Sequence, residues 1–389
     1  MMWSNFDLFN AIANLSVIDT WLLWTVIVLF LCQTIVHAGI YTRVKRYRLM
    51  RKRCATSDGS APISVVIPVF GEDKIFLEEN IFKFIEQTYE NKEIVIVYVG
   101  KDEDFYNEIK QIRTKYTEVN STQINYDPKY PISVKVAINI GIKASRYDNI
   151  VISSTDCVPS SKNWLEMMSK GFSYYDVILG YTRIRKDKGL LNLLARRYNF
   201  LSGVQWISQA FAGHPSGASH NNFGFTKDLY YSIRGFTHLN MNAGEDDLFV
   251  KELSTKTKIG LVLTGKATCT ETPPYSYKSW IRNTHHRGIT RRFYPLSARL
   301  LTMTDYISRV LFYLICLACV LRMGLVLQLC IAVLFILRWG INSIVMHHNA
   351  KRLGEKGLHC SSILFDFTDA CIGLYIHFTQ HSYKEKAWL

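Results

Sequence analysis

The chain has 389 residues, of which 48% are hydrophobic and 20% are charged, and its formal net charge is +14 at pH 7. Long uncharged apolar stretches exclude a wholly soluble chain, and most of the positive excess lies beside them, where anionic lipid headgroups are the expected partners. The sequence lacks the aromatic–basic motifs of RNA-binding modules, so we do not expect nucleic acid as a partner. The nine cysteines suggest neither a zinc site nor a disulfide framework.

The first apolar stretch, 21–40, contains no Asp, Glu, Lys or Arg and is long enough to cross a bilayer as a helix. Seven basic residues and no acidic one follow between 43 and 53. Because this cluster comes after the apolar run and not before it, a retained anchor is favoured over a cleaved signal peptide. The positive-inside rule places the basic side in the cytoplasm. We therefore expect a transmembrane anchor over 1–42 and a basic juxtamembrane linker over 43–60.

Between 61 and 275, predicted strands and helices alternate with short connections. This order is typical of an α/β domain with a mostly parallel sheet and right-handed crossovers. Continuous apolar runs predict buried strands, and apolar residues at helical spacing predict helices. The predicted strands are 63–69, 93–99, 121–126, 150–153 and 177–181, and the predicted helices are 76–88, 104–116, 133–145, 164–172 and 190–211.

The strand at 150–153 stops in the polar sequence Ser153-Ser154-Thr155-Asp156. In an open α/β sheet, ligands bind just past the carboxyl ends of the strands. Asp156 is therefore placed to hold Mg²⁺ or Mn²⁺, which prefer oxygen ligands and often combine one or two carboxylates with substrate phosphates. The alternative is that Asp156 caps the helix that begins near Lys162, or only closes a turn.

A second acidic group, Glu245-Asp246-Asp247, follows Gly244 and opens a short helix. Acidic residues suit the first turn of a helix because they interact favourably with its dipole, which is the structural alternative for this cluster. Three consecutive carboxylates also raise one another's pKa by like-charge repulsion. A carboxylate with a raised pKa is what a general base needs.

A second apolar region, 307–346, is interrupted only by Arg309, Arg322 and Arg338. The residues 322–324 provide a tight reversal between two helices. The resulting hairpin returns the chain to a basic stretch on the same side as the central domain, as the positive-inside rule requires.

We expect an amphipathic interface helix over 276–300 and a C-terminal membrane region over 301–389. The last segment, 363–378, carries Asp366 and Asp369. The sequence leaves open whether this segment lies in the interface or spans the membrane.

With these motifs in order, the chain resembles the membrane-anchored, inverting family-2 glycosyltransferases of the GT-A fold, the group that includes cellulose, hyaluronan and ceramide glycosyl-transferring enzymes. The resemblance covers about 60–300 and implies a GT-A nucleotide-sugar-binding fold with a Rossmann-like mixed sheet. The matching positions are Pro68 and Glu72 in the first strand and the turn after it, Lys135, Asn139 and Gly141, Asp156 with Cys157 and Pro159, Asn163-Trp164, Gly235-Phe236, and Glu245-Asp246.

The resemblance implies roles for these residues. Asp156 would hold the metal against the diphosphate of a nucleotide-sugar donor, and Asp246 would take the proton from the acceptor hydroxyl, with Glu245 or Asp247 positioning it. The implied donor-binding residues are Pro68, Glu72, Lys135, Asn139, Asp156, Arg287, Arg291 and Arg292. The loop 214–222 would wall the donor sugar and acceptor, and the implied acceptor-site residues are His214, Ser216, Asn221 and Trp280.

The chain also departs from the family pattern. The second strand ends in Tyr98-Val99-Gly100 where the family has Asp-Asp-Gly, and Ser154 replaces the first Asp of Asp-x-Asp. The family's Gln-x-x-Arg-Trp is absent as such. Arginines between 282 and 292 are similar to it in place and charge only, and the alternative is that they meet lipid headgroups.

We therefore predict a metal-dependent hexosyltransferase that moves a sugar from a nucleotide-diphosphate sugar to a hydroxyl of a lipid-linked or polysaccharide acceptor. It is expected in the bacterial inner membrane, with its catalytic domain in the cytoplasm. The first alternative is a catalytically inactive scaffold subunit of an envelope-polysaccharide assembly, which the altered motif positions favour. The second, a protein that only binds anionic lipid, leaves the ordered α/β motifs unexplained.

Overall fold

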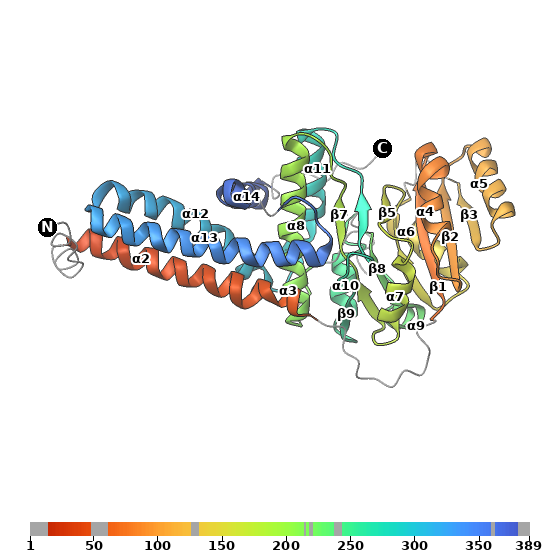
Figure 1. Cartoon of the computed structure of the whole chain (residues 1–389). Helices are drawn as coiled ribbons and strands as arrows, with labels where there is room; N and C mark the ends of the chain where they lie inside the picture. Colours follow the sequence, from red (N-terminus) through yellow and green to blue (C-terminus); the bar gives the residue numbers. More distant parts are fainter. Residues whose placement is uncertain are drawn as a thin grey trace.

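The computed structural model describes residues 15–47, 61–125, 132–213, 215–217, 221–236, 243–358 and 362–379. Figure 1 shows an elongated molecule, with three long helices side by side at one end and an α/β domain at the other. Helix α8 (Leu190–Phe211) stands between the two parts and runs across the direction of the long helices.

The main sheet has seven strands in the order β3-β2-β1-β4-β8-β6-β9. The strands are β1 (Ile63–Phe70), β2 (Lys92–Val99), β3 (Val119–Ile124), β4 (Asn149–Ile152), β6 (Val177–Leu179), β8 (Phe223–Thr226) and β9 (Ile259–Leu261). All neighbours pair in parallel except β8, which is antiparallel to both β4 and β6. The predicted α/β fold with a mixed sheet is confirmed, but β8 and β9 were not predicted, because each is only three or four residues long.

The central strands are apolar along their whole length because helices cover both faces of the sheet. In β1, Ile63, Val65, Ile67 and Val69 pack on one face and Val66 packs on the other. One face is covered by η2 (Phe76–Asn80), α4 (Ile81–Ile85), α5 (Glu103–Lys115) and α7 (Trp164–Phe172). The other is covered by α6 (Val134–Ala144), α8, α9 (Lys227–Ser232) and α10 (Asp247–Leu253).

A second, small sheet was not predicted from the sequence. It has the order β5-β10-β7, formed by β5 (Cys157–Pro159), β10 (Cys269–Glu271) and β7 (Thr182–Ile184). Strand β10 is antiparallel to β5 and parallel to β7. These three-residue strands are too short to show a period-2 pattern, yet they place the residues after β4 beside those of β10.

Three helical segments of the described chain are long and apolar enough to cross a membrane: Val17–Arg46, Leu296–Arg322 and Leu325–Leu353. The first comprises α2 (Val17–Thr34), η1 (Ile35–Tyr41) and α3 (Thr42–Arg46), and the others are α12 and α13. Helix α12 ends at Arg322 and α13 begins at Leu325, so the reversal predicted at 322–324 is confirmed.

The prediction of one continuous helix over 276–300 is wrong. The structure has α11 (Tyr277–Gly288), a short 3₁₀ turn η3 (Ile289–Phe293), and then the start of α12. The helix breaks at Pro295, because proline disfavours helical backbone in the residue before it. Tyr294 is accordingly extended, with φ −68° and ψ 153°.

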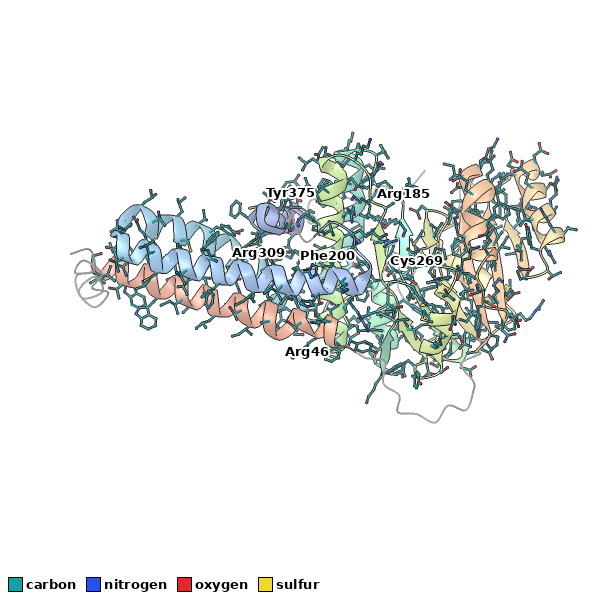
Figure 2. The ribbon with its side chains drawn as sticks, in the orientation of Figure 1. Arg46, Arg185, Phe200, Cys269, Arg309 and Tyr375 are labelled. Atoms are coloured by element: carbon teal, nitrogen blue, oxygen red, sulfur yellow. The ribbon has the colours of Figure 1, made fainter. Side chains whose placement is uncertain are left out.

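The last helix, α14 (Ser362–Thr379), is seen end-on in Figure 1, whereas the long helices run lengthwise. It lies across the base of the bundle and packs against α8, α11, α12 and α13. Figure 2 shows Tyr375 of α14 and Arg309 of α12 near this junction, close to Phe200 of α8. The segment that the sequence left undecided therefore adopts a crosswise position.

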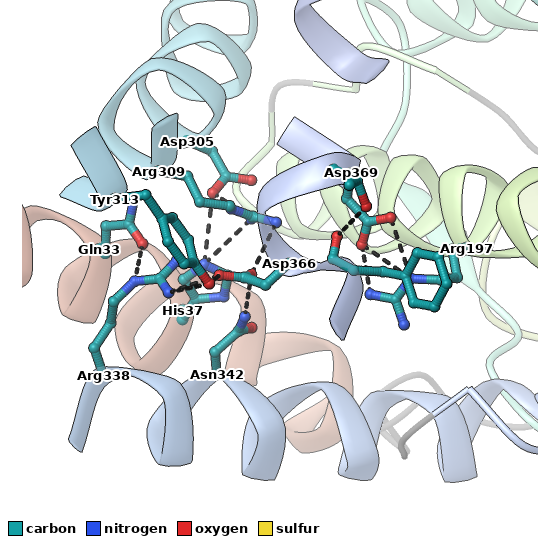
Figure 3. A network of polar contacts seen from close by, with 12 residues as sticks. Gln33, His37, Arg197, Asp305, Arg309, Tyr313, Arg338, Asn342, Asp366 and Asp369 are labelled. Atoms are coloured by element: carbon teal, nitrogen blue, oxygen red, sulfur yellow. Dashed lines mark hydrogen bonds and ion pairs between the residues drawn. The ribbon is translucent and has the colours of Figure 1, made fainter. Parts of the chain in front are cut away.

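A buried charge network occupies the junction (Figure 3). Asp305 accepts a hydrogen bond from Arg309 at 2.7 Å, and Arg338 pairs with Asp366 at 2.6 Å. Arg309 also lies 3.4 Å from Asp366, and all four side chains are at most 2% exposed. Two carboxylates and two guanidinium groups therefore balance one another between α12, α13 and α14.

Further buried pairs tie α8 to the C-terminal segments. Arg197 donates to both carboxylate oxygens of Asp369 in α14, and Arg196 donates to Glu355 at 3.0 Å. The Glu355 carboxylate also accepts from the Tyr181 hydroxyl at 2.9 Å. Both partners of each ion pair are buried, so these contacts connect α8 to α14 and to the segment after α13 without leaving a buried charge unpaired.

Candidate active site

A cavity of about 500 Å³ lies between the strand ends, α8, α11 and the first turns of α12. On the strand side it is lined by Asp73 and Asn80 after β1 and by Thr155 and Asp156 after β4. Helix α8 lines it from Ala195 to Gln209, a length of about 20 Å at 1.5 Å per residue. The cavity thus continues from the edge of the sheet to the base of an apolar helix.

Asp156 lies in a tight turn between β4 and β5, at the edge of the cavity. Ser154 and Cys157 form a bridge around it, and the Ser154 hydroxyl donates to Asp156 Oδ1 at 2.5 Å. The backbone of the turn is fixed from outside, because Asn80 donates to the carbonyl of Thr155 at 2.8 Å. Asp156 does not cap the next helix, since α7 begins at Trp164 with Asn163 as its N-cap. It does close a turn, and it is exposed toward the cavity.

The acidic cluster Glu245-Asp246-Asp247 also lines the cavity. Asp246 is the N-cap of α10, and its Oδ1 accepts from the backbone N–H of Asp247 at 2.7 Å. The helix-capping alternative is therefore realised. The cap uses the carboxylate of Asp246 alone, and those of Glu245 and Asp247 make other contacts.

Asp247 is the buried member of the cluster, with 6% exposure. Its Oδ2 accepts hydrogen bonds from the hydroxyls of Thr290 and Tyr294, and its Oδ1 accepts from the backbone N–H of Leu248. Burial, and next the charge of Asp246, raise the pKa of Asp247 to about 7, while these hydrogen bonds oppose the rise. The contacts hold η3 against the start of α10, which suits a positioning role for Asp247.

Arg287, in the last turn of α11, faces three carboxylates. It forms an ion pair with Glu271 of β10. Partial loss of solvation in the cavity opposes its charge, but the negative charges of Glu271, Asp156 and Asp246 outweigh that loss and raise the pKa of Arg287 above its usual value. The positive charge of Arg287 is therefore stabilised by both acidic sites that the sequence identified.

Arg291 lines the cavity as well, whereas Arg292 does not. Arg291 donates to the Tyr198 hydroxyl of α8 at 2.7 Å. Arg292 is exposed, and its guanidinium carbon lies 4.8 Å from the centre of the Phe293 ring. Of the three arginines predicted to bind the diphosphate, two thus border the cavity.

The predicted acceptor-site residues divide in the same way. Ser216 and Trp280 line the cavity, and both are buried. Asn221 is not part of the cavity wall as described. Its backbone carbonyl instead accepts a hydrogen bond from the Cys157 thiol at 3.8 Å. His214 lies outside the described residues.

Four predicted donor-binding residues lie away from the described cavity wall. Pro68 is buried inside β1, and Glu72 is exposed in the turn after it. Asn139 accepts from the Tyr230 hydroxyl at 3.2 Å. Lys135 is 1% exposed and donates to the carbonyl of Ala243 at 2.7 Å, so it supports the segment that leads into the acidic cluster.

The end of β2 is occupied by an aromatic side chain. Tyr98 is 1% exposed and stacks on Tyr106, with 5.9 Å between the ring centres. Its hydroxyl accepts from the backbone N–H of Asp102 at 3.2 Å. The Tyr98-Val99-Gly100 departure from the family pattern therefore replaces a polar strand end with a packed one.

Several cavity residues were missed by reasoning from the sequence. Asp73 and Tyr198 line the cavity without belonging to a recognisable motif, and Thr290 and Tyr294 are found only through their contacts with Asp247. Glu271 precedes Thr272-Pro273-Pro274, a loop signal that could have marked it, but no spacing links it to Arg287.

The cavity's oxygen ligands fit a hard divalent cation. Asp156, in the turn before β5, lies next to Glu271 at the end of β10, because Glu271 pairs with Cys157 in the β5–β10 register. Among the described residues, no three His, Cys, Asp or Glu side chains are grouped closely enough to hold a metal by themselves. This donor set suits an ion that takes one or two carboxylates together with substrate phosphates.

The sheet order, the strand-end cavity and the paired acidic sites define a glycosyltransferase fold. The sequence profile of glycosyl transferase family 21 matches residues 24–379. The chain therefore belongs to glycosyl transferase family 21.

A solved mannosyltransferase structure shows the same fold at low sequence identity. A mannosyltransferase from Pyrobaculum calidifontis, PcManGT, solved with GDP-Man and Mn²⁺, is 14% identical with a TM-score of 0.53, and the match covers 89% of this chain and 99% of that one. S. aureus TarS 1–349, solved with UDP-GlcNAc, is 14% identical with a TM-score of 0.40, covering 82% and 92%. No curated protein sequence shows detectable similarity to the chain.

Proposed function

We propose that this glycosyltransferase spans the membrane and moves a hexose, with inversion, from a nucleotide-diphosphate sugar to a hydroxyl of a lipid-linked or polysaccharide acceptor at the cytoplasmic face. The observation that carries the proposal is the continuity of one cavity. It joins Asp156, which follows β4, and Asp246, at the start of α10, to Ala298, Thr302 and Met303 in the first turns of α12.

The donor would occupy the strand side of this cavity. Arg287 presents a planar guanidinium group, which suits bidentate contact with phosphate oxygens. Asp156 would hold Mg²⁺ or Mn²⁺ together with the diphosphate, and the ion would supply Lewis-acid assistance to the leaving group. The mannosyltransferase PcManGT, solved with GDP-Man and Mn²⁺, supports this assignment by analogy of fold.

The acceptor would enter from the side of α8 and α12. Asp246 is the proposed base that takes the proton from the acceptor hydroxyl, because it lines the cavity at the start of α10. Trp206 and Met303 provide apolar wall on this side. Such a wall beside an apolar helix suits a lipid-linked acceptor.

The proposed orientation rests on charge. Arg43, Lys45 and Arg46 lie at the end of the first apolar helix that adjoins the α/β domain, and Lys351 and Arg352 lie in the last turn of α13. Figure 2 shows Arg46 at this end of the bundle. Basic residues gather on the cytoplasmic side of membrane helices.

The test is the binding of a panel of nucleoside diphosphates to the full-length protein in detergent, with and without Mn²⁺. We expect one base to be preferred, its binding to become tighter when Mn²⁺ is added, and an Asp156→Ala variant to lose the Mn²⁺ effect. The Asp228→Ala variant serves as a control, because Asp228 is exposed on α9. Absence of binding to every nucleoside diphosphate, with and without metal, would rule out the transferase.

A second candidate, an inactive scaffold subunit, is favoured by one observation. At the position of the first Asp in the family's Asp-x-Asp, this chain has Ser154, whose hydroxyl donates a hydrogen bond to Asp156. The same panel separates the two candidates, because a scaffold subunit needs no metal-dependent binding of a nucleotide.

A further inference from the structure

The ion pair between Glu271 and Arg287 crosses the cavity from the small sheet to helix α11. Glu271 has a rigid backbone, because β10 is the central strand of its sheet and pairs with both β5 and β7. Its carbonyl also accepts from the backbone N–H of Arg185 at 2.8 Å. The Glu271 carboxylate is therefore held at a fixed place in the cavity wall, opposite the guanidinium group.

This pair differs from the structural ion pairs of the protein. In the pairs Arg196–Glu355, Arg197–Asp369 and Arg338–Asp366, every side chain is at most 8% exposed. In the cavity pair, Glu271 is 12% exposed and Arg287 is 38% exposed. An anion that enters the cavity can therefore reach Arg287 without disturbing the core.

The balance of charge in the cavity creates a difficulty for an anionic ligand. Among the described lining residues, the acidic ones outnumber the arginines six to three: Asp73, Asp156, Glu245, Asp246, Asp247 and Glu271 against Arg287, Arg291 and Arg299. A diphosphate that enters must compete with Glu271 for the guanidinium group. A carboxylate and a phosphate present similar pairs of oxygen atoms to arginine.

We propose that Glu271 is a positioning residue that holds Arg287 in place for the diphosphate and exchanges it with the donor. In the empty site the carboxylate fixes the guanidinium group toward the cavity. When the diphosphate binds, Arg287 passes to the phosphate oxygens, and when the nucleoside diphosphate leaves, Glu271 takes Arg287 back. This inference rests on the proposed function, because it assumes a nucleotide-sugar donor and assigns Arg287 to the diphosphate of that donor.

Two consequences distinguish exchange from a purely structural ion pair. Removing the charge of Glu271 frees Arg287 for phosphate, so diphosphates bind more tightly. Removal of the competing carboxylate also slows product release, so that both KM and kcat fall in the Glu271→Gln variant. A structural pair would leave affinity unchanged or weaken it.

The experiment measures binding of pyrophosphate, GDP and UDP by titration calorimetry, without metal, to four full-length proteins: wild type, Glu271→Gln, Arg287→Gln and the double variant. We expect Glu271→Gln to bind diphosphates about tenfold more tightly and Arg287→Gln about tenfold more weakly, as for loss or gain of one charged hydrogen-bond partner. In the Arg287→Gln background, the Glu271→Gln change should alter affinity by less than about twofold, because its effect acts through Arg287.

The matched control is Glu166→Gln, which breaks the exposed Glu166–Lys170 pair on α7 and should change no affinity. An equal or weaker affinity in Glu271→Gln overturns the inference. So does a tenfold gain that persists without Arg287, because that result indicates simple repulsion by Glu271. If pyrophosphate binds with the expected pattern but no member of the nucleoside diphosphate panel competes with it, with or without Mn²⁺, the exchange stands and the proposed function fails.

Discussion

The hydroxyl of Tyr294 donates a hydrogen bond to Oδ2 of Asp247 at 2.5 Å, and this contact connects the residue after η3 to the start of α10. Thr290 donates to the same oxygen. Asp247 follows directly after Asp246, the proposed base, so one carboxylate links η3 to the acidic cluster at the start of α10.

The raised pKa of Asp247 predicts that the stability of the protein depends on pH. The pKa of Asp247 is raised from 3.8 to about 7 by burial and by the charge of Asp246. Between these values the folded state binds more protons than the unfolded state, so wild type loses stability as the pH rises from about 4 to about 7. We expect Asp247→Asn, which cannot ionise, to gain in thermal midpoint relative to wild type as the pH is raised from about 5 to about 8. A difference between the two proteins that is constant over this range would show that Asp247 does not titrate as a buried acid.

The fold was largely predictable because its strongest signals are local. The predicted helices 164–172 and 190–211 coincide with α7 and α8, and α7 carries its apolar residues at helical spacing. The small sheet was not predictable, because three-residue strands such as β5 and β10 are defined by their partners and not by their own sequence.

The same distinction applies to the site. Asp156 and the 245–247 cluster follow a strand end and a glycine, and the structure brings both to one cavity with Arg287. Glu271 could not be found in this way, because its importance depends on a contact across 16 positions of the chain between a strand and a helix. Lys135 was assigned to the donor, whereas its contact with Ala243 is visible only in the folded chain.

The assignment of Asp246 as the base predicts a loss of catalysis without a loss of binding. Asn is as effective an N-cap as Asp, so Asp246→Asn should leave α10 intact. We expect sugar transfer to fall by about 10²–10⁴-fold while the affinity for the nucleoside diphosphate stays nearly constant. The measurement combines an acceptor-turnover assay with calorimetric binding.

Asp102→Asn is the matched control for this prediction. Asp102 is also a helix N-cap, accepting from the backbone N–H of Phe105 at 2.6 Å, but it does not line the cavity as described. Its turnover should match wild type. Retention of full turnover in Asp246→Asn would transfer the role of base to another carboxylate.

The charge network at the base of the apolar helices predicts strong coupling between Arg338 and Asp366. Removing one partner leaves an uncompensated buried charge, so Arg338→Met and Asp366→Leu should each destabilise the protein by about 3–5 kcal/mol. Removing both leaves Asp305 and Arg309 as a balanced pair, still joined at 2.7 Å. The double variant should therefore recover most of the lost stability, as measured by thermal unfolding in detergent.

The Arg322–Asp19 pair at the far end of the bundle is the control, because Arg322 is 48% exposed and the same changes there should leave the midpoint of thermal unfolding unaltered. Destabilisations that simply add in the Arg338–Asp366 double variant would mean that the network holds the helices by packing and not by balancing charge.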